Sequence, residues 1–180
     1  MASTISVWRQ RIGYGAADLS CNLIWQMITL YLLFYYTDVA GLAAAHVSLL
    51  FLLTRFVDGI TDILMGVVID KTNTRWGKSR PYFLIGAVPF GLLAVLTFLV
   101  PDVGEAGKLV YAYITYIGLS AAYTMVNIPM ASILPSLTSD ANERTTLATV
   151  RIVFALIGAT AVSALTLPMV DALGGGSQAQ

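Results

Sequence analysis

Five apolar stretches divide the chain, and each is bounded by charged residues or by a cluster of glycine and proline. They cover residues 12–36, 44–68, 81–100, 109–133 and 148–170. Each is long enough to cross a bilayer as a helix, which needs about 20 apolar residues. The alternation of apolar and polar residues that a membrane barrel requires is absent from the sequence. The pattern therefore predicts an all-α, polytopic membrane protein with five transmembrane helices and short connections.

The composition supports this class. Hydrophobic residues make up 57% of the 180 residues and charged residues 11%, whereas a soluble domain is about 45–50% apolar and about 25% charged. Such a chain contacts membrane lipids and is unlike soluble enzymes, disordered segments and nucleic-acid binders. The sequence holds no Ser/His/Asp set, no metal-ligand helix pair and no phosphate-binding glycine loop. It predicts a protein that is not an enzyme and uses no cofactor.

Basic residues gather on one side of the predicted spans. Two precede the first span, four lie in the connection 69–80 and one lies in the connection 134–147: Arg9, Arg11, Lys71, Arg75, Lys78, Arg80 and Arg144. The opposite side holds Lys108. Because Lys and Arg near helix ends stay on the cytoplasmic side, the N-terminus and both connections are predicted to be cytoplasmic. Within 134–147 we expect Asp140, Glu143 and Arg144 to form a solvated face.

Four charged residues lie inside the predicted spans, namely Asp18, Arg55, Asp58 and Asp62. A charge at the centre of a span costs about 2.5–3.5 kcal/mol and persists only with a partner or a polar cavity. Arg55, Asp58 and Asp62 follow the spacing i, i+3, i+7, which places them on one helical stripe. Two carboxylates one turn apart do not both ionise cheaply unless a cation lies between them, so the stripe predicts a Na⁺ or proton site. The alternative is a buried Arg–Asp pair that only fixes helix packing, which would not need the second acid.

Polar stripes on two other spans favour a water-filled cavity. One stripe lies in 12–36 and one in 109–133; their members are Tyr14, Asp18, Asn22, Trp25, Gln26, Tyr123, Thr124 and Asn127. Together the stripes are typical of a cavity that binds a ligand with hydroxyl groups, whereas each residue alone is equally well explained by hydrogen bonds between helices. Arg151 lies near the start of the fifth span and faces either this cavity or the cytoplasmic surface.

Several motifs give the chain a family resemblance. They are the run GVVIDKTNTRWGKSRP at 66–81, YYTDVAG at 35–41, the stripe from Arg55 to Asp62, and YTMVNIP at 123–129. Together they resemble the glycoside-pentoside-hexuronide:cation symporters of the major facilitator superfamily, with the glucuronide carriers most similar and the melibiose carriers related. The resemblance implies a cation-coupled sugar symporter that works by alternating access in the bacterial inner membrane. The chain would supply the first five helices of the N-terminal half.

The resemblance also implies roles for individual residues. In the melibiose carriers the acids that match Asp58 and Asp62, with the threonine that matches Thr124, form the cation site, and we assign Thr61 to the same site. Family sugar contacts come from the first, fourth and fifth helices; here the expected residues are Asp18, Asn22, Trp25, Tyr123, Asn127 and Arg151. Gating or structural roles fall to Arg55, Asp70, Arg75, Gly77, Lys78 and Arg80.

The substrate prediction depends on where the chain departs from the melibiose carriers. Two sugar-binding acids are replaced by Asn22 and Asn127, the adjacent lysine by Cys21 and a pocket tryptophan by Ala131. Because the loss of two acids favours an anionic ligand, we predict a glucuronide or a related glycoside. The alternatives are an uncoupled facilitator or efflux protein of the same superfamily, and a membrane scaffold or receptor that transports nothing. A carrier of this superfamily has two six-helix halves, so we expect the chain to be part of a longer carrier, inactive without the C-terminal helices.

Overall fold

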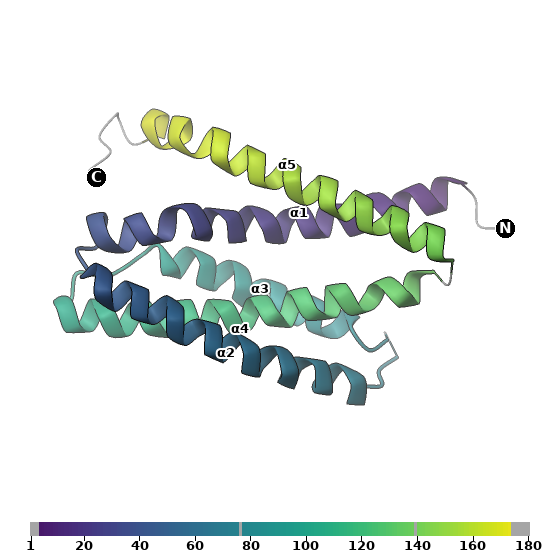
Figure 1. Cartoon of the computed structure of the whole chain (residues 1–180), viewed down its shortest axis with the longest axis horizontal. Coiled ribbons are helices and arrows are strands. Elements are labelled where there is room, and N and C mark those ends of the chain that lie inside the picture. The colour runs from purple at the N-terminus through teal and green to yellow at the C-terminus, as the bar shows by residue number, and fades with distance from the viewer. Residues whose placement is uncertain (1–3, 76, 139, 174–180) are drawn as a thin grey trace. The chain divides into compact units, whose positions relative to one another are not determined.

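All the regular structure in the described part of the chain is helical. The computed structural model describes residues 4–75, 77–138 and 140–173. Five α-helices follow one another (Figure 1), and α1 continues directly into a short π-helix, η1. The bounds are α1 Thr4–Phe34, η1 Tyr35–Val39, α2 Ala44–Lys71, α3 Arg80–Thr97, α4 Glu105–Leu137 and α5 Ala141–Leu173. The predicted all-α class with five helices is confirmed.

Three of the helices are long and apolar enough to cross a membrane. The qualifying segments are Arg11–Val39, Glu105–Leu134 and Ala141–Ala172, and α3 contributes the shorter apolar segment Pro81–Thr97. Helix α2 is long, with 28 residues, but the three charged residues of its stripe lower its apolar character. The helices define a multi-pass membrane protein.

The connection predicted at 134–147 is much shorter in the structure, because α4 runs to Leu137 and α5 begins at Ala141. Asp140 explains the early start of α5: its Oδ1 accepts the backbone N–H of Asn142 at 3.0 Å. An aspartate in this position caps a helix N-terminus by satisfying a backbone donor that has no partner within the helix. The apolar pattern alone placed the start of the span at residue 148, one and a half to two turns too late for the helix.

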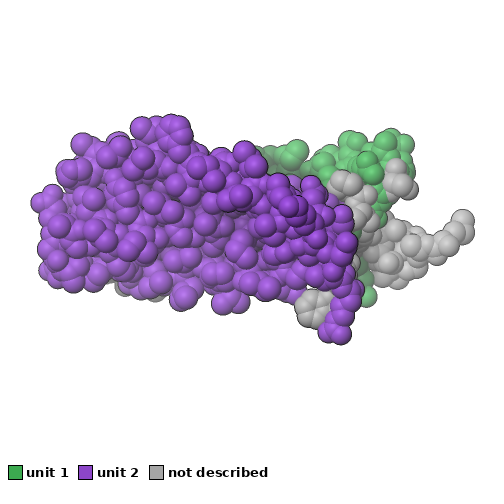
Figure 2. Space-filling view, turned by 90° about the horizontal axis from the view of Figure 1, so that it is seen from below, with its two compact units in different colours: residues 1–31, 134–180 green, residues 32–133 purple. Residues whose placement is uncertain are grey.

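The chain divides into two compact units, coloured separately in Figure 2. Unit 1 comprises residues 1–31 and 134–180 and therefore contains most of α1 and all of α5. Unit 2 comprises residues 32–133 and contains η1, α2, α3 and most of α4. The contacts described below lie within one unit or the other.

In unit 1, α1 and α5 lie side by side and run in the same direction. A Cβ atom added at Gly15 would lie 2.9 Å from Phe154 Cδ2 and 3.1 Å from Val150 Cγ1. A Cβ atom added at Gly158 would lie 2.9 Å from Leu19 Cδ1. A Cβ atom at Gly15 would require the Phe154 ring to move, whereas one at Gly158 meets only the end of the flexible Leu19 side chain, so glycine matters most at Gly15 for the approach of the helices. The contacts advance along both helices together, which defines the parallel direction.

In unit 2, α4 packs between its two neighbours in register. Helix α3 runs antiparallel to α4, since the Tyr111 hydroxyl donates to the Leu96 carbonyl at 3.0 Å and the rings of Phe90 and Tyr123 lie 5.7 Å apart. Helix α2 runs parallel to α4, and the rings of Phe51 and Tyr116 lie 5.1 Å apart. Because the two helices run parallel, residues spaced one turn apart on α2 face residues spaced one turn apart on α4. The first candidate site lies between these two helices.

Candidate functional site

Both acids of the α2 stripe meet a hydroxyl of α4. The Ser120 hydroxyl donates to Asp58 Oδ1, and the Thr124 hydroxyl donates to Asp62 Oδ1 at 2.9 Å. The acids are one turn apart on α2 and the hydroxyls one turn apart on α4, so the two hydrogen bonds repeat along the parallel pair. We call these four residues the carboxylate–hydroxyl ladder.

The hydroxyls of the ladder are buried and the acids are more accessible. Ser120 and Thr124 are 2% and 5% exposed, whereas Asp58 is half-buried and Asp62 is exposed. Carboxylate and hydroxyl oxygens are hard ligands of the kind that alkali and alkaline-earth cations prefer. Within 4–75, 77–138 and 140–173, no three His, Cys, Asp or Glu residues converge as they would around a transition metal.

Arg55 and Thr61 lie beside the ladder with lesser roles in it. Arg55 Nη1 is 3.8 Å from Asp58 Oδ2, and its side chain is 72% exposed. An ion pair this long and this accessible contributes little to stability, which argues against a stripe that serves helix packing alone. The Thr61 hydroxyl donates to the backbone carbonyl of Asp58 at 3.1 Å, so it points along its own helix.

Ser120 is the ladder residue that sequence reasoning missed. A serine in an apolar helix usually bonds to the carbonyl one turn earlier, and carries no signal by itself. The available signal was its spacing: Ser120 precedes Thr124 by four residues, as Asp58 precedes Asp62. Once one acid is paired with one hydroxyl between parallel helices, the same spacing predicts the second pair.

Unit 1 brings together three of the predicted substrate residues around one buried carboxylate. Arg151 Nε donates to Asp18 Oδ1 at 2.8 Å, and Asn22 Nδ2 donates to Asp18 Oδ2 at 2.9 Å. The Asp18 side chain is 4% exposed and that of Arg151 30% exposed. We call Asp18, Asn22 and Arg151 the Asp18 cluster. Arg151 therefore contacts the polar stripe of α1, while its place in a substrate cavity stays a prediction.

The other predicted substrate residues are divided between the units. Trp25 is half-buried on α1 in unit 1, one turn beyond Asn22. Tyr123 and Asn127 are half-buried on α4 in unit 2, and the Tyr123 ring packs against Phe90. A pocket lined by residues of both units stays a prediction.

The connection between α2 and α3 contains a tight turn. Gly77 has φ +96°, a conformation that side-chain-bearing residues rarely adopt. Its N–H donates to the Thr74 carbonyl at 3.0 Å, and the Thr74 hydroxyl donates to the Gly77 carbonyl at 2.6 Å. Lys78 Nζ reaches the backbone carbonyl of Asp70 at 3.4 Å. The turn gives Gly77 and Lys78 structural roles, while Asp70 and Arg75 are exposed and the Arg80 side chain lies outside the described residues.

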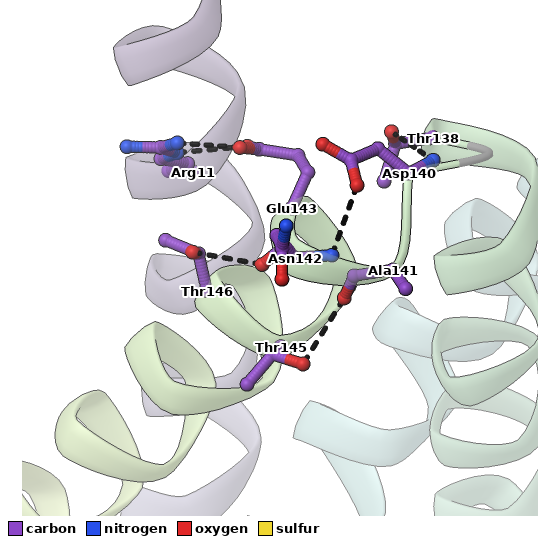
Figure 3. A network of polar contacts seen from close by, with 8 residues as sticks. All are labelled: Arg11, Thr138, Asp140, Ala141, Asn142, Glu143, Thr145 and Thr146. Carbon is purple, nitrogen blue, oxygen red and sulfur yellow. Dashed lines mark hydrogen bonds and ion pairs between the residues drawn. The ribbon is translucent and has the colours of Figure 1, made fainter.

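A network at the N-terminal end of α5 corrects the prediction of a solvated face there (Figure 3). Arg11 Nε donates to Glu143 Oε1 at 2.8 Å and its Nη2 donates to Oε2 at 2.5 Å. This two-point pairing joins α1 to α5, so Glu143 is bound to another helix and is not merely solvated. Arg144 bonds through Nε to the Thr138 carbonyl at 2.9 Å. The prediction failed for Glu143 because it placed this residue in a loop, away from α1.

Apolar helices long enough to cross a membrane define a membrane protein, and the acids that α2 pairs with hydroxyls of α4 are typical of a polar site inside one. The comparison with known families agrees and goes further. The chain belongs to the family described as MFS/sugar transport protein, which it matches over residues 13–180. The major facilitator assignment, the transporter class and the absence of an enzyme family follow from this membership.

Several curated relatives of the chain carry the names of sugar or glycoside transporters. The chain is 49% identical over 170 residues to the isoprimeverose transporter of Lactiplantibacillus pentosus, a match that covers 94% of the chain and 36% of the relative. It is 43% identical over 170 residues to a putative glycoside/cation symporter of Escherichia coli, covering 94% and 37%. It is 43% identical over 145 residues to the glucuronide carrier protein homolog of Escherichia coli, covering 80% and 32%. The resemblance to glycoside:cation symporters is confirmed, and the chain spans about a third of the length of these relatives.

Proposed function

We propose that this protein carries out cation-coupled symport of a glycoside by alternating access, with Na⁺ or a proton as the coupling ion. The observation that carries the proposal is the carboxylate–hydroxyl ladder. Two acids inside an apolar helix are costly, and their partners across the helix interface are neutral hydroxyls. A cation at Asp58 and Asp62 would compensate the charge that the hydroxyls leave uncompensated.

Coupling follows if the ion and the sugar each stabilise the binding of the other. Ion binding at Asp58 and Asp62 neutralises the charge on α2. Moving a neutral helix through the apolar interior, as the carrier changes conformation, costs less free energy than moving a charged one. By thermodynamic linkage, a sugar that binds better to the ion-loaded form raises the affinity for the ion by the same factor. Thr124 holds Asp62 in place, and Thr61 adds a hydroxyl next to Asp58.

The substrate is proposed to be a glucuronide or a related glycoside. Arg151, Asn22 and Trp25 on unit 1 offer a cation, an amide and an aromatic plate, and Tyr123 and Asn127 on unit 2 offer further hydrogen-bonding groups. Such groups fit a sugar ring, whose hydroxyls need donors and acceptors and whose apolar face stacks on an aromatic ring. If glucuronides compete with the transported sugar for uptake, a glucuronide substrate is supported. If uncharged pentosides compete and glucuronides do not, the glucuronide is rejected.

The protein is proposed to lie in the bacterial inner membrane with its N-terminus in the cytoplasm. The charge distribution along the sequence supports this orientation, because seven basic residues fall on one side of the predicted spans and Lys108 on the other. The Arg11–Glu143 pair and the Gly77 turn would then both be on the cytoplasmic side. Cysteine labelling at exposed Lys71 and exposed Asp102 would test the orientation, with opposite accessibility expected at the two sites.

Uphill glycoside uptake tests the transport proposal. Because the chain is expected to be inactive without the C-terminal helices, the whole carrier that contains it is expressed in bacteria, and uptake is measured with and without a Na⁺ gradient and a pH gradient. Asp58→Asn and Asp62→Asn should each abolish accumulation against the gradient, while Asp102→Asn is the control because that carboxylate is 94% exposed. Accumulation that persists in both α2 variants would reject the cation assignment. Equilibration that needs no gradient would instead support the facilitator alternative.

A further inference from the structure

The Asp18 carboxylate uses both of its oxygens on its own protein. Oδ1 accepts a hydrogen bond from Arg151 Nε and Oδ2 accepts one from Asn22 Nδ2. The side chain is 4% exposed. Little of the carboxylate surface is therefore open to a sugar hydroxyl, although the sequence predicted Asp18 as a sugar contact.

The partners of Asp18 are the more accessible members of the Asp18 cluster. The Arg151 side chain is 30% exposed, and Asn22 is half-buried. Arg151 is bound to Asp18 through Nε, and its side chain is also hydrogen-bonded to the Tyr14 side chain of α1. The carboxylate thus holds the plane of the guanidinium, because an Nε bond restricts rotation of the whole planar group.

Asp18 also sets the orientation of the Asn22 amide. Nδ2 donates to both the Asp18 side chain and the Asp18 backbone carbonyl, each at 2.9 Å. Since an ionised carboxylate and a carbonyl can only accept, the amide nitrogen must face Asp18. The amide oxygen is then directed away from Asp18, as an acceptor. One carboxylate in this way fixes a donor group on α5 and an acceptor group on α1.

We propose that Asp18 is a positioning residue for substrate, which holds Arg151 as a donor and Asn22 as an acceptor for neighbouring hydroxyls of a sugar ring. Adjacent ring hydroxyls present an oxygen to the donor and a hydrogen to the acceptor, so the pair fits a vicinal diol. This inference rests on the proposed glycoside transport. It assigns the substrate contacts to Arg151 and Asn22 and removes Asp18 from them.

A double-mutant cycle on KM tests the proposal. Uptake of p-nitrophenyl α-xyloside, β-glucoside and β-glucuronide is measured for the whole carrier that contains the chain, with membrane levels checked by immunoblot. Asp18→Asn and Arg151→Gln should each raise KM for the transported probe about 10-fold or more, as expected for loss of a hydrogen bond to a charged group. In the double variant KM should stay well below the product of the two single increases, because Asp18 acts through Arg151, and its excess over Arg151→Gln should not exceed the effect of Asn22→Ala, the share that acts through Asn22.

The outcomes separate the inference from the function on which it rests. Additive effects in the double variant, or an Asp18→Asn variant with wild-type KM, would overturn the positioning role while leaving glycoside transport intact. No uptake of any of the three probes by the wild-type protein would overturn the transport proposal and the inference together. If Asp18→Asn alone fails to reach the membrane, recovery of the protein in the double variant with the KM of Arg151→Gln supports the proposal, and failure to recover overturns it.

Discussion

Replacing Thr124 with valine probes the carboxylate–hydroxyl ladder with little change of shape. The Thr124 hydroxyl donates to Asp62 Oδ1 at 2.9 Å, and hydrogen bonds to charged groups contribute about 1.5–3 kcal/mol. Asp62 is exposed in the structure, so the lower end of this range applies. A loss of about 1.4 kcal/mol is a tenfold change in an equilibrium constant. We therefore expect the half-saturating concentration of the coupling cation to rise about tenfold.

The assay is the initial rate of glycoside uptake, measured against Na⁺ concentration at fixed pH and against pH at fixed Na⁺. Thr124→Ser keeps the hydroxyl and should stay close to the wild type. Thr115→Val is a matched control on the same helix, because the Thr115 hydroxyl bonds at 2.8 Å to the Tyr111 carbonyl of its own helix. Unchanged cation dependence in Thr124→Val, or an equal change in Thr115→Val, would refute the reasoning.

Four further outcomes are expected. Ser120→Ala should raise the same half-saturating cation concentration, because its hydroxyl is the partner of Asp58; an unchanged value would remove Ser120 from the site. Gly15→Ala should destabilise the protein relative to Gly13→Ala by about 1–3 kcal/mol in thermal unfolding in detergent, since a Cβ at Gly15 meets Phe154 at 2.9 Å and one at Gly13 meets nothing within 4 Å. Arg11→Ala and Glu143→Ala should each lower the melting temperature, and the double variant should be no worse than the worse single one. Gly77→Ala should also lower the melting temperature, because backbone strain at φ +96° costs about 1–2 kcal/mol of unfolding free energy, while Gly91→Ala should not lower it.

The sequence predicted the α2 half of the ladder because charge inside an apolar span is costly and the spacing of acids on a helix is fixed by geometry. Asp58 and Asp62 needed no tertiary information. Ser120 did, because a hydroxyl inside a helix is as well satisfied by its own backbone, as Thr115 is. Only the parallel packing of α2 and α4 distinguishes a hydroxyl bonded to a carboxylate of the other helix from one bonded to its own backbone. The relative position of helices far apart in sequence is not encoded in the local pattern.

Arg151 and Glu143 show the same limit at the start of α5. The apolar pattern began this span at residue 148, whereas the helix begins at Ala141 behind the Asp140 cap. The cap adds seven helical residues and places Glu143 on α5, where it reaches Arg11. Arg151 then lies about three turns inside the helix and meets Asp18. The sequence shows an aspartate, Asp140, before the apolar span, and an aspartate can cap a helix. Hydropathy, however, does not tell how far a helix extends beyond its apolar stretch.

The charge balance of the two units explains why a coupling cation is expected at the ladder and not at Asp18. In the Asp18 cluster one carboxylate meets one guanidinium at 2.8 Å, so the charges −1 and +1 sum to zero and Asn22 adds none. In the ladder two carboxylates meet two neutral hydroxyls, and Arg55 pairs with Asp58 at 3.8 Å through a side chain that is 72% exposed. When both acids are ionised, as binding of a cation between them requires, −2 and +1 from Arg55 leave a net charge of −1. A cation that enters the membrane interior is therefore stabilised at the ladder, where it compensates the negative charge. At Asp18 it would be stabilised only after displacing Arg151.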